Sequence, residues 1–109
     1  MINRGVVMLR PAAPFLEWAK SLDDSGLAPD PNDERTVYLV PEWEDDAGKE
    51  RVLRAVFTEL FEQELFGWHT DEADWPQMRG LREFRKWFDI EMHSMVVDVC
   101  GDALFDDEV

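Results

Sequence analysis

The stretch 51–66, RVLRAVFTELFEQELF, constrains the fold more than any other part of the chain, because its apolar residues recur with the period of an α-helix. The residues that fall within one half of the helical wheel are Leu53, Val56, Phe57, Leu60, Phe61 and Leu65. Asp45 or Asp46 is placed to cap the start of this helix, and Gly67 follows its last apolar residues, where a left-handed residue commonly ends a helix. The sequence therefore predicts a long amphipathic helix whose apolar face must be covered by other elements.

Glu64 interrupts the apolar face of this helix. At 100° per residue it projects about 20° from Leu53, inside the apolar arc. It also lies in the last turn, where the helix dipole disfavours an acid by roughly 0.3–1 kcal/mol. Either the carboxylate forms a salt bridge to a neighbouring helix or is exposed in the last turn, or it is a functional group.

Two short apolar runs, 6–9 and 36–40, are each followed closely by a proline and predict strands. Between them, apolar residues recur at helical spacing after Pro14, which suits the first turn of a helix. They are Phe15, Trp18, Ala19 and Leu22. Residues 23–35 are rich in proline and acids and predict a loop to which no chemistry can be assigned. The order strand, helix, strand favours a parallel, right-handed crossover.

Two further elements are predicted after the long helix. A third helix is indicated by the recurrence of Met78, Leu81, Phe84 and Phe88. Its basic residues are Arg79, Arg82, Arg85 and Lys86, and the partners expected for them on the long helix are Glu59, Glu62 and Glu64. Residues 94–100, SMVVDVC, alternate weakly and predict an edge strand, because Asp98 needs water or a partner.

Together these elements predict an α/β (α+β) fold in the order β-α-β-α-α-β. The expected architecture is a two-layer sandwich in which three helices cover a three-stranded mixed sheet. We expect the first two strands to be parallel and the third to be antiparallel to them. The length of 109 residues fits a single domain, 1–109, with an acidic tail at about 102–109.

The charge of the chain excludes several classes of partner. It carries 25 acidic and 11 basic residues, a net charge of −14, which repels phosphate backbones and anionic membrane surfaces. The apolar run 6–9 is too short for the core of a signal peptide or for a membrane span. Cys100 is the only cysteine, so that no intrachain disulfide can form. We therefore expect a cytoplasmic protein that binds neither nucleic acid nor membranes.

The sequence contains no familiar signature for a cofactor or a metal. The motifs GxGxxG, GxxxxGK[ST] and GxSxG are absent, so no cofactor is predicted. The acidic segment 42–46 lacks the ligand spacing of a calcium loop and is better explained as a solvated run that caps the long helix. His69, His93 and Cys100 do not have zinc-binding spacing. We accordingly predict no metal site.

One edge of the expected sheet offers a candidate active site. If successive elements alternate in direction, the ends of the first two strands, at Arg10 and Glu42, meet the start of the third strand at His93. An arginine, an acid and a histidine could serve as anion anchor, orienting carboxylate and general base. The alternative is that these strand ends are polar for solvation alone.

Five tryptophans in so short a chain are unusual, and three of them, Trp43, Trp68 and Trp75, are flanked by acids in connecting segments. The loop that we predict to bind a partner contains Trp68, His69, Asp71, Glu72, Asp74 and Trp75. Aromatic anchors bind partners strongly, and neighbouring acids select a basic one. The alternative is that the indoles fold inward and form a satellite core beneath the loops.

The spacing of VVMLRPAAPFLEWAKSL, VYLVPEW, the Trp75-Pro76 pair and LREFRKWF resembles a small family of uncharacterised acidic bacterial proteins. The resemblance covers most of the chain, but it rests on hydrophobic and turn residues and implies no activity and no catalytic residue. We predict a non-catalytic protein-interaction or regulatory module that binds a basic protein partner or a second copy of itself. The alternatives are a small enzyme that uses Arg10, Glu42 and His93, and an acidic nucleic-acid mimic that occupies a DNA-binding protein.

Overall fold

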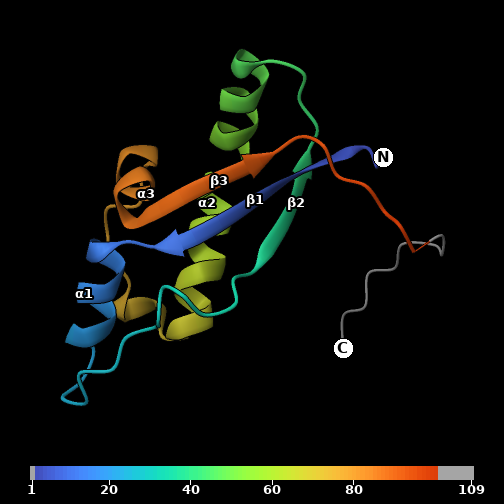
Figure 1. The fold of residues 1–109 in the computed structure, drawn as a ribbon. Coiled ribbons are helices and arrows are strands. Elements are labelled where there is room, and N and C mark those ends of the chain that lie inside the picture. Colours follow the sequence, from blue (N-terminus) through green and yellow to red (C-terminus); the bar gives the residue numbers. More distant parts are fainter. Residues whose placement is uncertain (1, 101–109) are drawn as a thin grey trace.

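The computed structural model describes residues 2–100 of the chain. Its elements, in order, are β1 (Arg4–Pro11), α1 (Ala13–Ser21), β2 (Val37–Pro41), α2 (Asp46–Trp68), the 3₁₀ turn η1 (Glu72–Asp74), α3 (Leu81–Trp87) and β3 (Phe88–His93). The predicted order β-α-β-α-α-β and the α+β class are confirmed, with η1 as an addition between α2 and α3. Figure 1 shows the long helix α2 crossing behind the three strands.

β1 is the central strand of a sheet whose order is β2-β1-β3. Both neighbours run antiparallel to it: Met8 of β1 pairs with Val37 of β2 and with Glu91 of β3. The predicted parallel pairing of the first two strands is therefore wrong, and the sheet is antiparallel rather than mixed. The reason is the path of the connection. A parallel pair would need the chain to return along the whole sheet, but α1 lies at the carboxyl end of β1 and residues 22–36 lead back to that same end.

The two faces of the sheet differ in burial. Gly5, Val7 and Leu9 alternate along β1 on the face toward α2 and are buried. Val37 and Leu39 lie on the opposite face and remain 52% and 49% exposed. Among the described residues, the helices therefore form a single layer against one face of the sheet, which is the predicted two-layer arrangement.

The largest fully buried side chains gather where α2 meets α3 and the start of β3. Phe61, Phe84 and Phe88 come from these three elements, and each is at most 1% exposed. Their ring centroids lie 5.2–5.6 Å apart in tilted or edge-on orientations. Aromatic rings prefer such arrangements to stacking face to face. The long helix thus supplies the centre of the core, as its apolar periodicity predicts.

The predicted apolar face of α2 is confirmed in detail. Of its predicted members, Leu53, Leu60, Phe61 and Leu65 are buried, whereas Val56 and Phe57 are half-buried at its border. The Asp45 carboxylate accepts a hydrogen bond of 2.7 Å from the backbone N–H of Gly48, so Asp45 rather than Asp46 is the cap.

The carboxyl end of α2 differs from the prediction. Gly67 does not end the helix, because its backbone is not left-handed and the helix continues to Trp68. The last turn is closed by a hydrogen bond of 2.8 Å from the backbone N–H of His69 to the carbonyl of Leu65. The two extra residues extend α2 to Trp68, which lines a pocket together with Phe15 of α1.

The third strand lies earlier in the chain than predicted. Phe88 has the helical spacing from Phe84, but α3 ends at Trp87, and Phe88 begins a strand that pairs with β1. The predicted strand at 94–100 is not formed, although the N–H of Ile2 donates a hydrogen bond of 2.9 Å to the carbonyl of Val96. The predicted acidic tail at about 102–109 lies outside the described residues.

The short helix α3 starts later than predicted and pairs with a different acid. Met78 precedes it and is 74% exposed. Arg85 donates to both carboxylate oxygens of Glu50 at 2.6 Å, instead of pairing with the predicted acids near the other end of α2. The predicted pairing between the two helices therefore forms, but with another partner on α2.

Candidate functional site

A pocket of about 440 Å³ lies among the last turns of α2, the start of β2, the loop 22–36 and α1. Four aromatic side chains line it: Phe15, Tyr38, Phe66 and Trp68. Its acidic lining residues are Asp30, Asp33, Glu34 and Glu64, and Arg35 is the one basic residue that lines it. A concave site with apolar walls and a few convergent polar groups is the usual form of a ligand site.

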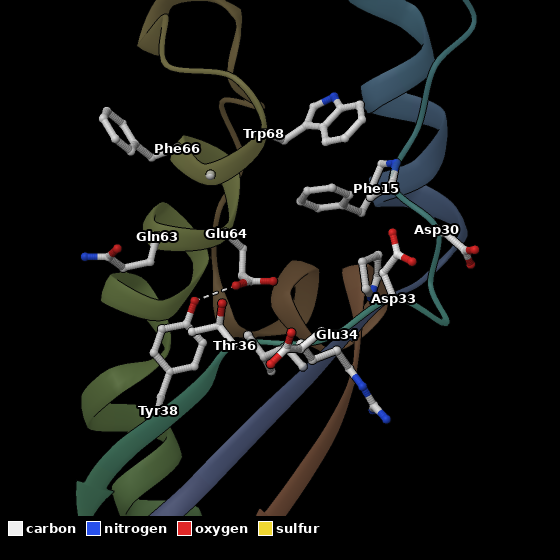
Figure 2. A pocket seen from close by; sticks show the side chains of 15 residues that line it. Phe15, Asp30, Asp33, Glu34, Thr36, Tyr38, Gln63, Glu64, Phe66 and Trp68 are labelled. Atoms are coloured by element: carbon white, nitrogen blue, oxygen red, sulfur yellow. Dashed lines mark hydrogen bonds between the residues drawn. The ribbon is translucent and has the colours of Figure 1, made fainter.

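Glu64 and Tyr38 meet inside this pocket (Figure 2). The hydroxyl of Tyr38 donates a hydrogen bond of 2.5 Å to Oε2 of Glu64. The two residues meet because Glu64 projects from the apolar side of α2, while Tyr38 lies on the face of β2 that turns toward the helices. Glu64 is therefore paired with a strand tyrosine, and neither the expected salt bridge to a neighbouring helix nor the expected exposure in the last turn is found.

Burial changes the protonation of both groups. It raises the pKa of Glu64 above its usual value, because the charged carboxylate loses hydration, and the hydrogen bond from Tyr38 offsets part of this rise. Burial, together with the hydrogen bond to Glu64, raises the pKa of Tyr38 far above its usual value. Tyr38 thus keeps its proton at neutral pH and acts as a fixed donor to Glu64.

The walls of the pocket place aromatic rings beside this carboxylate. In Figure 2 the Glu64 carboxylate lies below the Phe15 ring and the Trp68 indole lies above it, all three on the same side of α2. Trp68 is 37% exposed, so that apolar surface continues from the pocket to the outside of the molecule, whereas the side chain of Phe66 points to the other side of α2 in Figure 2. The pocket therefore combines a half-buried acid with aromatic surface that solvent reaches.

The structure does not bring Arg10, Glu42 and His93 together. His93 pairs with Val6, four positions along β1 from Arg10, a separation of about 13 Å at the rise of a strand. Glu42 follows β2 at the amino end of β1, also away from Arg10. The predicted active site fails because it depended on a parallel first pair of strands. His93 instead lies 3.2 Å from Glu91, its neighbour on the same face of β3.

The predicted partner-binding loop is anchored to the core through Trp75, although its three acids stay exposed. Trp75 is 7% exposed, and its indole N–H donates to the carbonyl of His69 at 2.8 Å. The indole N–H of Trp18 donates to the carbonyl of Asp74 at 2.9 Å, and the Asp74 carboxylate lies 2.8 Å from Nε2 of His69. Trp75 therefore belongs to the core, as the alternative expectation required, and cannot anchor a partner.

Asp71 and Glu72 of that loop remain exposed, but Asp71 caps η1 by accepting from the backbone N–H of Ala73 at 3.0 Å. Trp43 also folds inward, over Gly5: a Cβ atom on Gly5 would lie 2.1 Å from the Trp43 ring. Of the three tryptophans in connecting segments, Trp68 alone lines the pocket.

Two other classes of site are absent from the residues that the structure describes. Within 2–100, no three His, Cys, Asp or Glu residues are grouped so that they could hold a metal ion. In the same range, no helix is both long and apolar enough to cross a membrane.

Comparison of the chain with protein-family models, with curated proteins and with solved structures found no match. The resemblance to acidic bacterial proteins therefore remains a prediction.

Of the residues that line this pocket, the sequence singles out Glu64 and Trp68 as candidate functional residues, but not the others. The signal was Glu64, an acid within an otherwise apolar helical face, and the pocket is built around it. Tyr38 and the loop 22–36 were missed as site components, because their approach to Glu64 depends on the antiparallel return of the chain. Nothing in the local sequence of the loop marks it as a pocket wall.

Proposed function

We propose that this protein is a non-catalytic interaction module that binds a basic protein partner. The observation that carries the proposal is the pocket at the end of α2, where acidic and aromatic side chains converge around Glu64. The binding surface thus lies on the pocket side of Trp68 instead of in the loop that follows it. A cytoplasmic setting fits the single cysteine of the chain.

The aromatic surface supports binding to a protein. Trp68 leaves apolar area open beside the pocket. Large aromatic side chains contribute much of the energy of protein interfaces when a partner covers them. α2 is packed into the core, so the Trp68 anchor is held before a partner arrives and little conformational entropy is lost.

The charge supports a basic partner. The net charge of −14 attracts a cationic partner from a distance and speeds its association. At the pocket itself, four acidic residues outnumber the single Arg35. A binding role also fits the chemistry of the pair at its centre, because Tyr38 retains its proton and is committed to Glu64.

Fluorescence anisotropy with a labelled lysine-rich peptide tests this proposal. Trp68→Ala should weaken binding at least tenfold, which corresponds to about 1.4 kcal/mol. Met78→Ala is the matched control, because Met78 is 74% exposed and lies outside the pocket. Equal binding by both variants, or binding of the native protein to a neutral peptide as tightly as to the basic one, would refute the proposal.

A further inference from the structure

We infer that the pocket receives the ammonium group of a single lysine side chain of the partner, with Glu64 as its counter-charge. This inference rests on the proposed function and identifies the chemical group that the pocket selects. It stands on the cavity, on the position of Glu64 within it, and on the hydrogen bond from Tyr38.

The hydrogen bond from Tyr38 favours an ammonium over a guanidinium. A guanidinium binds a carboxylate most strongly through two parallel hydrogen bonds, one to each oxygen. In Glu64, Oε2 already accepts a hydrogen bond of 2.5 Å from Tyr38. Oε1 keeps both of its lone pairs for a ligand, whereas a planar fork would have to share Oε2 with the Tyr38 hydroxyl, so the compact charge of an ammonium group fits better.

The walls of the pocket suit a lysine side chain, and its volume leaves room for one. Its volume of about 440 Å³ lies within the range of roughly 300–1,000 Å³ that is typical of ligand sites. Phe15 and Trp68 offer apolar surface to the methylene groups of lysine. Aromatic faces also attract cations, most strongly where water is excluded. A lysine side chain thus meets aromatic surface beside a charge partner.

The charged and titratable groups that line the pocket with Glu64 influence both the binding of a cation and the pKa of Glu64. They are Tyr38 on β2 and Asp30, Asp33, Glu34 and Arg35 on the loop, whereas α1 contributes the uncharged Phe15. An ammonium beside Glu64 favours the charged carboxylate, so bound ligand lowers the pKa of Glu64. Arg35 is the one lining group that repels the incoming cation, and its removal should strengthen binding.

Nuclear magnetic resonance provides the test, with the Glu64 carboxyl carbon and the Trp68 indole N–H as reporters. The probes are N-acetyl-lysine methylamide, the corresponding arginine compound, the neutral norleucine compound and n-butylammonium. We expect the lysine compound to shift both reporters, to bind at least tenfold more tightly than the norleucine compound, and to bind more tightly than the arginine compound. With saturating lysine compound, the pH midpoint of Glu64 should fall.

Two variants sharpen the test. Glu64→Gln, which preserves shape and can still accept from Tyr38, should weaken binding of the lysine compound at least tenfold, and Arg35→Gln should strengthen it. Thermal melts and amide spectra confirm that each variant is folded before binding is compared. Unchanged binding by Glu64→Gln, or an arginine compound that binds as tightly as lysine, would overturn the inference. Tighter binding of n-butylammonium than of the lysine compound would assign the pocket to free amines and also overturn it.

This test separates the inference from the proposed function. A lysine-rich peptide that binds the native protein and Glu64→Gln equally well refutes the lysine pocket but leaves the interaction module intact. A lysine compound that shifts Glu64, with no affinity for basic peptides or proteins, supports the pocket and refutes the module.

Discussion

Tyr38 and Glu64 connect β2 to the last turns of α2 through a hydrogen bond of 2.5 Å between the tyrosine hydroxyl and the carboxylate. Both side chains are half-buried. A buried carboxylate is costly unless it is paired, so this contact compensates part of the cost of keeping Glu64 on the apolar side of the helix. The same contact orients Glu64 within the pocket.

Tyr38→Phe removes the donor and leaves the half-buried carboxylate without this partner. We expect a loss of roughly 1–3 kcal/mol in the free energy of unfolding at pH 8, where Glu64 is most fully charged. The pKa of Glu64 should rise further, because the hydrogen bond from Tyr38 favours the charged form. Urea denaturation and carboxyl NMR titration measure the two effects. An unchanged unfolding midpoint together with an unchanged titration would show that the hydrogen bond is unimportant.

Glu64 also makes the stability of the protein depend on pH. Its pKa is raised on folding, so the folded state binds more protons than the unfolded state between the unfolded and the folded pKa. The contribution of Glu64 to stability is therefore full below the unfolded pKa and falls as the pH rises through the folded pKa. Glu64→Gln removes this dependence. Its free energy of unfolding relative to the native protein should increase from pH 4 to pH 8, and a difference that decreases over that range would contradict the expected sign.

Phe61 and Phe66 lie on the same helix, α2, but differ in burial, so they give a matched test of the core. Phe61 is fully buried, whereas Phe66 is 55% exposed. Phe61→Ala should cost roughly 3–5 kcal/mol by removing a large side chain from the core. Phe66→Ala should change stability by no more than about 0.5 kcal/mol, as surface substitutions usually do. If urea denaturation shows similar losses of stability for the two variants, the face of α2 that contains Phe61 is not the face packed into the core.

Replacing Gly5 or Gly67 by alanine should have opposite effects on stability. In Gly5→Ala the new Cβ would lie 2.1 Å from the Trp43 ring, so the indole must move, at a cost of roughly 1–3 kcal/mol. In Gly67→Ala the Cβ meets nothing within 4 Å and the residue is helical. That substitution should stabilise the protein by up to about 1 kcal/mol. A neutral Gly5→Ala in thermal melts would show that Trp43 is not seated on β1.

Much of the fold follows from local patterns. The apolar residues of α2, its cap at Asp45 and the order of the elements are confirmed, because each depends on residues close in sequence. The pairing direction of β1 and β2 was mispredicted, since it depends on where the loop 22–36 leads and not on the strands themselves. The position of β3 was also mispredicted, because Phe84 and Phe88 fit a helical spacing as well as they fit the junction of a helix with a strand.

In the candidate site, too, features that depend on neighbouring residues could be predicted, and features that depend on distant ones could not. Glu64 could be singled out from sequence because it conflicts with its own helix, and such conflicts sometimes mark functional positions. Its partner Tyr38 could not, because the contact joins residues 26 positions apart through an unpredicted strand direction. Trp68 and Trp75 have similar acidic neighbours, yet one lines the pocket and the other is core. Burial decided between them, and burial depends on the packing of the whole chain.

The most direct test of the account is an amide and indole NMR titration of the native protein with a lysine-rich peptide. We expect the largest shifts at the Trp68 indole and at the Thr36 and Gly67 amides, all of which line the pocket. The buried Trp75 indole, which donates to the His69 carbonyl, should change little. Doubling the salt concentration should weaken the interaction, because exposed charges contribute to it. Shifts centred on another surface, or no shifts at saturating peptide, would contradict the proposal that this pocket binds a basic partner.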